Sequence, residues 1–165
     1  MPKTLYLVRH AKSSWVNPSY SDFDRPLNDR GQRDAPEMGR RLKAKGIRPD
    51  LIVCSPARRA IETLELLNAE LGVDQDSIYM QKRLYEASTP TLIDIIQSLE
   101  NSDESAMVIG HNPSMSWVAT QISGEPIGDL PTCSVVGLEL DSNDWNMAGI
   151  CAAKKIFLDY PKKQA

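Results

Sequence analysis

Residues 4–10, Thr-Leu-Tyr-Leu-Val-Arg-His, predict a β-strand that ends in an arginine and a histidine. A second apolar run, residues 106–110, ends in the same way at His111. In an open α/β sheet, ligands bind beyond the carboxyl ends of the strands. We therefore expect His10 and His111, the two histidines of the chain, to meet in one site. Because imidazole changes charge or attacks near neutral pH, this pair indicates an enzyme.

Strand-like and helix-like segments alternate along the chain, which predicts an α/β fold: a three-layer α/β/α sandwich around a mostly parallel sheet. The last two strands are expected to form a hairpin or a sheet edge. The strands are expected at about residues 5–9, 51–54, 78–81, 106–109, 135–140 and 151–158.

Four helices are expected between these strands, and proline or a capping residue marks most of their starts. Pro56 and Pro113 each open a helix, and Thr89 caps another. The start of the first helix stays open. Asn28 is a good N-cap but leaves Pro36 inside the helix, whereas capping at residue 34 (Asp) puts that proline in the first turn.

The bulk composition is that of an ordinary globular protein, with 41% hydrophobic and 25% charged residues. The 165 residues fit one domain, residues 1–165. A net charge of -3 argues against a general nucleic-acid binder, and no apolar run approaches the ~20 residues of a membrane span. The absence of a signal peptide and the three widely spaced cysteines indicate a cytoplasmic protein. Residues 162–165 are expected to form a frayed tail.

Three strand-to-helix junctions carry polar residues suited to an anion. They are Arg9-His10, residues 55–60 (Ser-Pro-Ala-Arg-Arg-Ala) and residues 110–113 (Gly-His-Asn-Pro). Helix N-termini favour anions, and arginine binds phosphate or carboxylate through two parallel hydrogen bonds. The junctions therefore predict a pocket for a tetrahedral anion with an imidazole at its base. Arginines and a second histidine would supply the charge, and no metal-ligand spacing is evident, so no cofactor is expected.

The same junctions resemble the motifs of the histidine phosphatase superfamily, also called phosphoglycerate-mutase-like. Residues 7–11 resemble its Arg-His-Gly signature, residues 55–63 its Ser-Pro-x-x-Arg-Ala-x-x-Thr motif, and residues 110–112 its second Gly-His block. Residues 22–31 (Asp-Phe-Asp-Arg-Pro-Leu-Asn-Asp-Arg-Gly) resemble the short branch, the phosphohistidine phosphatases of SixA type. The resemblance runs in order from about residue 3 to residue 122. It implies the phosphoglycerate-mutase-like fold.

The resemblance implies a role for each matching residue. His10 would be the nucleophile that accepts the phosphoryl group. Arg9, Arg59 and His111 would hold the phosphoryl oxygens, and Arg59 rather than its neighbour Arg58 occupies the family position before Ala60.

Four further residues are expected around this centre. Ser13 falls where relatives place a small residue of the phosphate pocket, and Glu86 falls near their carboxylate acid or base. Arg25 and Asn112 are expected to contact substrate, although Arg25 can instead order its loop together with the neighbouring aspartates. The stretch around His111, Gly-His-Asn-Pro, can also be a turn and N-cap. Glu86 can equally be an exposed carboxylate after a strand.

These observations predict a metal-independent phosphatase that hydrolyses protein phosphohistidine through a phosphorylated His10. The chain has no large lid insertion of the kind found in sugar-phosphate mutases, which favours hydrolysis in an open site. The expected partner is a phosphorylated protein, with no nucleic acid and no membrane. The alternatives are a phosphatase of small phosphomonoesters and a phosphate-binding scaffold without turnover. A cysteine phosphatase is excluded by register, because Cys-x5-Arg counted from Cys54 reaches Ala60.

Overall fold

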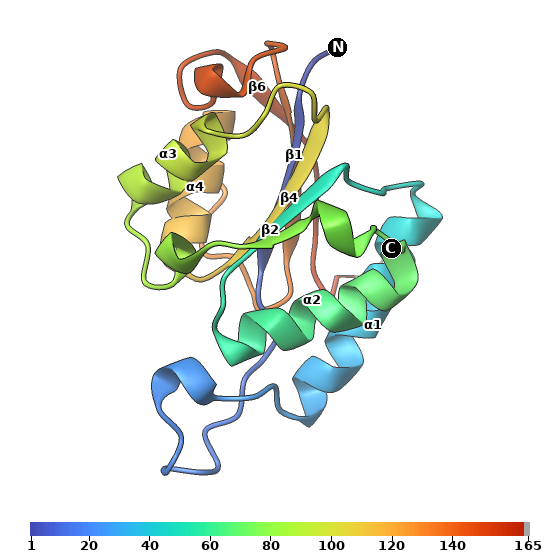
Figure 1. Cartoon of the computed structure of the whole chain (residues 1–165), viewed down its shortest axis with the longest axis vertical. Coiled ribbons are helices and arrows are strands. Elements are labelled where there is room, and N and C mark those ends of the chain that lie inside the picture. The colour runs from blue at the N-terminus through green and yellow to red at the C-terminus, as the bar shows by residue number, and fades with distance from the viewer. Residues whose placement is uncertain (164–165) are drawn as a thin grey trace.

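The computed structural model describes residues 1–163, which form one six-stranded sheet with helices on both faces (Figure 1). The strand order is β3-β2-β4-β1-β5-β6. Strands β1 to β4 run parallel to one another, β5 runs antiparallel to β1, and β6 runs antiparallel to β5. This arrangement confirms the predicted α/β fold with a mostly parallel sheet. The strands are β1 (Thr4–Arg9), β2 (Leu51–Cys54), β3 (Ile78–Met80), β4 (Ser105–Gly110), β5 (Val135–Leu140) and β6 (Ala153–Asp159).

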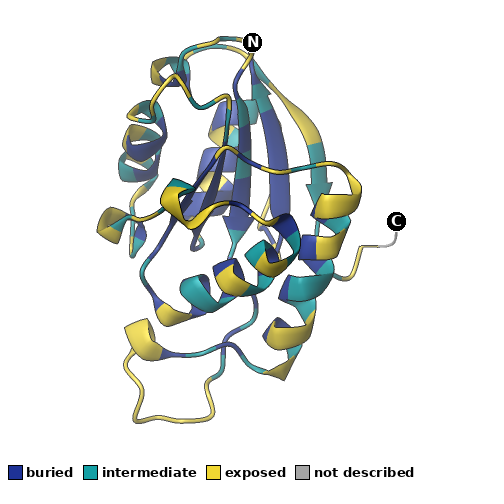
Figure 2. Cartoon of the chain, turned by 45° about the vertical axis from the view of Figure 1, so that its right-hand side comes forward, coloured by how far each residue is buried: buried dark blue, intermediate teal, exposed yellow. Residues whose placement is uncertain are grey.

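Alternation of side chains along the strands divides the core into two clusters, because successive residues of a strand point to opposite faces. On β4, Ala106 and Val108 pack with α3 (Thr89–Gln97) and α4 (Ser114–Ser123). Met107 and Ile109 pack on the other face with α1 (Asp29–Ala44) and α2 (Arg58–Leu71). Figure 2 shows these central strands buried between the helical layers. The predicted three-layer sandwich is confirmed.

The ends of the helices correct some of the expected boundaries. Asn28 caps α1 by accepting from Gly31 N, so Pro36 lies inside the helix. The side chain of Ser88, not Thr89, caps α3. The helices α2 and α4 begin one or two residues after the prolines expected to open them, at residues 58 and 114.

The expected frayed tail is only partly described, since residues 164 and 165 lie outside the described residues. The two lysines before them are ordered in a turn, where Lys163 N donates to Tyr160 O at 2.9 Å. None of the helices formed by residues 1–163 has the length and apolar character that a membrane crossing requires.

The segment from residue 12 to residue 28 links β1 to α1 and is called the β1–α1 loop here. It extends past the carboxyl ends of the parallel strands and is largely exposed around the short 3-10 helix η1 (Asp22–Asp24) (Figures 1 and 2). Its two ends are fixed, because Asn28 N donates to Lys12 O and Leu27 N donates to Glu62 Oε1 at 2.8 Å. Glycine is needed at Gly31, where a Cβ would lie 2.3 Å from Lys12 O.

Candidate active site

His10 lies directly after β1, and its backbone fixes the imidazole in one tautomer. The ring atom Nδ1 lies 2.7 Å from the carbonyl oxygen of Ala11. Because a carbonyl oxygen can only accept, Nδ1 carries the proton and Nε2 carries the free lone pair. The side chain is buried at 7% exposure. His10 is therefore held as a neutral imidazole whose Nε2 bears the lone pair, and this lone pair accepts a hydrogen bond from Arg59 Nε in the free site.

Arg59, in the first turn of α2, reaches this nucleophile. Its Nε lies 3.3 Å from His10 Nε2. Thr63, one turn further along α2, fixes the geometry because its Oγ1 donates to Arg59 O and accepts from Ala11 N. One threonine therefore ties the helix that carries the arginine to the strand end that carries the histidine.

His111 follows β4, and its ring centroid lies 5.1 Å from that of His10. Its Nε2 pairs with Ser55 Oγ at 2.7 Å, which orients the ring from the end of β2. Arg9 anchors one guanidinium nitrogen on Leu130 O at 2.7 Å. Within residues 1–163, His111 Nδ1 and Arg9 Nε are buried polar atoms without a hydrogen-bond partner. Unpaired buried polar groups are costly, so each of these atoms lacks a partner that a ligand could supply.

Burial, together with the nearby cations, keeps both histidines neutral in the free site. Burial, together with the charges of His111 and the arginines, lowers the pKa of His10 to about 3. Burial and the charge of Arg59 lower the pKa of His111 to about 4. A bound phosphoryl dianion would raise both pKa values, because opposite charge favours the protonated form. The free site is thus a positively charged cavity with an unprotonated nucleophile.

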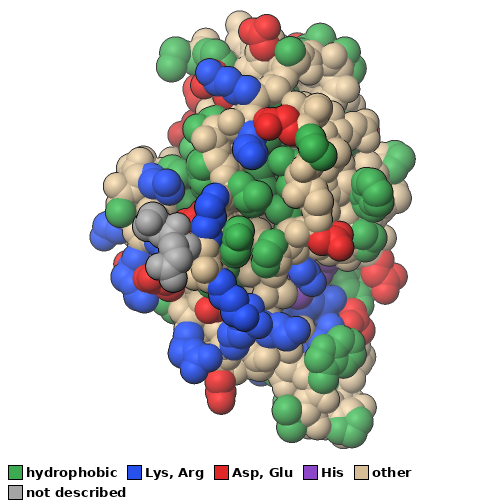
Figure 3. Space-filling view, turned by 180° about the vertical axis from the view of Figure 1, so that it is seen from behind, with side chains coloured by type: hydrophobic (Ala, Val, Ile, Leu, Met, Phe, Trp, Pro, Cys, Tyr) green, Lys and Arg blue, Asp and Glu red, His purple; other side chains and the backbone are tan. Residues whose placement is uncertain are grey.

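These groups line a cavity of about 220 Å³. Figure 3 shows histidine surface in this region among Lys and Arg side chains. The cavity collects all the sequence-predicted site residues except Glu86. Its lining residues are Arg9, His10, Lys12, Ser13, Trp15, Arg25, Arg59, His111, Asn112 and Thr132.

The structure places two of the predicted site residues, Glu86 and Asn112, in different surroundings. Glu86 is exposed with a positive φ of 57° and is not among the residues that line the cavity, while its neighbour Tyr85 lies edge-on to His111 with 5.7 Å between the ring centroids. Asn112 lines the cavity but also caps α4, since its Oδ1 accepts from Ser116 N and Oγ. Asn112 therefore supports the start of α4 and also lines the cavity.

The β1–α1 loop forms the mouth of the cavity through Arg25. This arginine is buried, donates to Ser13 Oγ at 2.7 Å, and stacks at 3.5 Å on the ring of Trp15, which is 73% exposed. Arg25 also pairs with Asp22 Oδ1 through Nη2 at 3.0 Å. Arg25 therefore both orders the loop and lines the site.

Asp22 and Tyr85 were missed as site residues in the sequence. Arg59 Nη2 contacts Asp22 Oδ2 at 3.1 Å, and Tyr85 OH donates to the same oxygen at 2.6 Å. Asp22 had one usable signal, its place within the short-branch stretch of residues 22–31. Tyr85 had none, because its contact joins positions 63 residues apart. The roles of Ser55 and Thr63 are hidden for the same reason.

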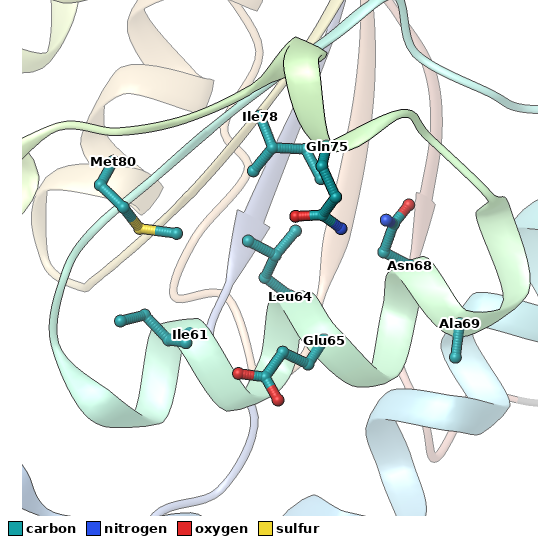
Figure 4. Close-up of a pocket in the computed structure, with 8 residues that line it drawn as sticks. All are labelled: Ile61, Leu64, Glu65, Asn68, Ala69, Gln75, Ile78 and Met80. Atoms are coloured by element: carbon teal, nitrogen blue, oxygen red, sulfur yellow. The ribbon is translucent and has the colours of Figure 1, made fainter.

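Three other features of the described chain do not offer the chemistry of this site. Residues 1–163 contain no cluster of three or more His, Cys, Asp or Glu side chains that could hold a metal ion. Cys54 is a buried residue of β2, and burial raises the pKa of its thiol. A cavity of about 380 Å³ between α2 and β3 is lined mainly by apolar side chains such as Ile61 and Met80, with Glu65 as its charged residue (Figure 4). A carboxylate does not favour an anion there.

Comparison with known proteins identifies a family and several relatives of similar sequence or fold. Residues 5–92 match the family model of the Histidine phosphatase superfamily (branch 1). A Mycobacterium tuberculosis protein is 38% identical over 156 residues, covering 88% of this chain and 95% of the relative. A solved structure from Agrobacterium tumefaciens, assigned as the phosphohistidine phosphatase SixA, is 28% identical with a TM-score of 0.83, covering 98% and 99% of the two chains. The protein histidine phosphatase SixA complexed with tungstate, at 22% identity and a TM-score of 0.82 over 96% and 97%, shares the fold.

Proposed function

Because the chain belongs to the histidine phosphatase superfamily and is a phosphatase, we propose that it works through a phosphorylated His10 and acts on protein phosphohistidine. The main support for His10 as the nucleophile is its fixed tautomer. Its Nδ1–H is held by Ala11 O at 2.7 Å, which leaves the Nε2 lone pair inside a cavity lined by arginines. The single domain expected over residues 1–165 is part of the same proposal.

In the proposed first step, His10 Nε2 attacks phosphorus, a nitrogen–phosphorus bond forms, and the bond to the leaving group breaks. Arg59, Arg9 and His111 hold the phosphoryl oxygens, so positioning and charge neutralisation lower the barrier. In the second step, water attacks phosphorus and the electrons of the broken bond return to Nε2. The two-step route replaces one difficult displacement with two easier ones. The arginines supply the positive charge, so the proposal includes no metal.

The proposed substrate is a phosphorylated histidine on a protein. Support comes from the relative assigned as the phosphohistidine phosphatase SixA, which matches over nearly the full length of both chains. It also comes from the mouth of the cavity, where Trp15, Val16 and Tyr20 are exposed side chains of the β1–α1 loop. Exposed apolar and aromatic side chains beside a site suit contact with a protein surface. Ser13, Arg25 and Asn112 are proposed to contact the substrate.

The test compares wild type with His10→Ala in excess chelator, on a histidine-phosphorylated protein and on an aryl phosphate. We expect phosphate release from both substrates by wild type and a loss of at least about 10³-fold in the variant. Acid quenching of wild type during turnover should trap a phosphoenzyme with the acid lability of phosphohistidine. A matched control is Arg58→Ala, whose side chain is exposed and pairs with Glu62 on the helix surface.

Each outcome separates the alternatives. A higher kcat/KM for the phosphoprotein supports phosphohistidine as the substrate class, and a higher value for small phosphomonoesters favours the small-molecule alternative. Turnover that survives in His10→Ala would contradict the nucleophile. Tight phosphate binding without any wild-type turnover would instead favour a non-catalytic scaffold.

A further inference from the structure

The two ring nitrogens of His111 have different surroundings. Nε2 lies 2.7 Å from Ser55 Oγ, whereas Nδ1 is buried and has no hydrogen-bond partner within residues 1–163. Because His111 lines the cavity, Nδ1 is the ring nitrogen that remains for a ligand. A neutral imidazole carries one proton, so Nδ1 either donates a hydrogen bond or offers a lone pair. Phosphoryl oxygens only accept, so the neutral ring can bind one through Nδ1 only when the proton is on that atom.

The hydroxyl group of Ser55 distinguishes these two forms of the ring. Ser55 is fully buried directly after β2, and its Oγ accepts from Ala57 N at 3.2 Å. Within the described chain, the other hydrogen-bond partner of this oxygen is His111 Nε2. Buried donors are almost always satisfied, so the hydroxyl proton goes to Nε2. A nitrogen that accepts this proton carries none of its own, which leaves the ring proton on Nδ1.

Backbone hydrogen bonds hold both partners of this contact in place. Ser55 N donates to Ile109 O at 3.0 Å, which ties the end of β2 to β4 just before His111. Ala57 N fixes the Ser55 oxygen from the start of α2. Met115 N donates to His111 O at 3.0 Å and so fixes the backbone of the histidine. The contact between the serine and the imidazole is therefore formed before a ligand arrives.

We propose that Ser55 is a positioning residue that selects the Nδ1–H tautomer of His111, an inference that rests on the proposed function of the site. The Ser55 hydroxyl donates to Nε2, and the opposite nitrogen is left as an N–H donor for a phosphoryl oxygen. With the proton on Nε2 instead, the lone pair of Nδ1 would meet the lone pairs of that oxygen and repel it. Ser55 thus acts on phosphate through His111 and does not contact phosphate itself.

The choice of tautomer matters because His111 is neutral in the free site. Burial and the charge of Arg59 lower the pKa of His111 to about 4, so at pH 7 the ring has a single proton to place. His10 is fixed in the same tautomer by a different partner, the carbonyl oxygen of Ala11. The two histidines then have complementary tasks. His10 offers a lone pair to phosphorus, and His111 offers a proton donor to oxygen.

The test reads the tautomer directly by NMR. The chain has two histidines, so the imidazole ¹⁵N spectrum at pH 7 contains two rings, and His111→Asn assigns them. In wild type we expect His111 to have a protonated Nδ1 and an unprotonated Nε2. In Ser55→Ala the His111 ring should become a mixture of both tautomers. Ser134→Ala is the matched control, because Ser134 is equally buried but donates to the backbone oxygen of Pro131, and its spectrum should match wild type.

Loss of the selected tautomer should also weaken the binding of phosphate. We would measure the Kd of inorganic phosphate and kcat/KM for p-nitrophenyl phosphate. In Ser55→Ala we expect the Kd to rise and kcat/KM to fall by about tenfold, the effect of one lost hydrogen bond in a buried site. Ser134→Ala should keep both values.

A protonated Nε2 on His111 in wild type, or an unchanged tautomer in Ser55→Ala, would overturn the proposal. An unchanged Kd for phosphate in a variant whose tautomer has changed would overturn the role in binding. Failure of the proposed function looks different, because His10→Ala would then retain turnover while the spectra keep their expected form. Thermal unfolding identifies a variant that does not fold, and the wild-type spectrum still decides the tautomer in that case.

Discussion

The floor and the mouth of the site are built by different means. The floor consists of His10, Arg59 and His111, which are at most 8% exposed and are placed by strand ends and a helix start. The mouth is the β1–α1 loop, where Trp15 and Val16 are 73% and 89% exposed. Backbone geometry fixes the floor before substrate arrives, whereas side-chain ion pairs order the mouth and can exchange partners. This difference predicts that substitutions in the floor lower kcat, whereas substitutions in the mouth raise KM.

Among substitutions that keep the proposed nucleophile, the largest effect is expected where the two regions meet, at Arg59. Arg59→Met removes the contact to His10 Nε2 and both contacts to Asp22. We expect kcat/KM to fall by about 10²- to 10³-fold, the cost of removing a donor from a developing oxyanion. The control is Arg58→Met, the same change one residue earlier on an exposed side chain. Similar losses in both variants would show that the helix surface, not the floor, limits the rate.

The buried histidines predict how the free energy of unfolding depends on pH. Their pKa values are about 3 for His10 and about 4 for His111 in the fold, against about 6.5 in an unfolded chain. The unfolded state therefore binds more protons between these values, and stability falls as the pH drops below about 6.5. Urea unfolding from pH 7 to pH 4 should show a loss of about a few kcal/mol. His111→Asn should have a shallower slope, and an equal slope would contradict a neutral, buried His111.

The floor of the site could be predicted from the sequence, whereas the contacts of the mouth could not. Strands are short apolar runs and junction residues follow them directly, so the positions of His10 and His111 could be read from local pattern. Asp22 could not be placed in this way, because its contacts cross to Arg59 and Tyr85 on other segments. Glu86 was placed by its resemblance to the family position, but it follows the 3-10 helix at residues 82–84 with a positive φ and is exposed. Long-range side-chain pairing has no local signal.

A smaller effect is expected from the tether between the two regions. Glu62 on α2 accepts from Leu27 N at 2.8 Å and so holds the end of the β1–α1 loop. Glu62→Ala removes a hydrogen bond to a charged group, and KM should rise by up to about tenfold with little change in kcat. Glu65→Ala, an exposed carboxylate on the same helix, is the control. A fall in kcat with unchanged KM would mean that the tether positions the floor rather than the mouth.

The smallest effect is expected from Trp15, at the outer edge of the mouth. Its ring lies 3.5 Å below the guanidinium of Arg25 and is otherwise in solvent. Such a contact at an exposed site contributes about 0.5–1 kcal/mol, so Trp15→Ala should raise KM for a small aryl phosphate by about two- to fivefold. We expect a protein substrate to contact the exposed ring as well, so its KM should rise more than that of the aryl phosphate. Trp117→Ala, which removes a ring of similar exposure on α4, is the control. Equal changes in KM for both substrates would show that Trp15 only supports Arg25 and that the protein surface is recognised elsewhere.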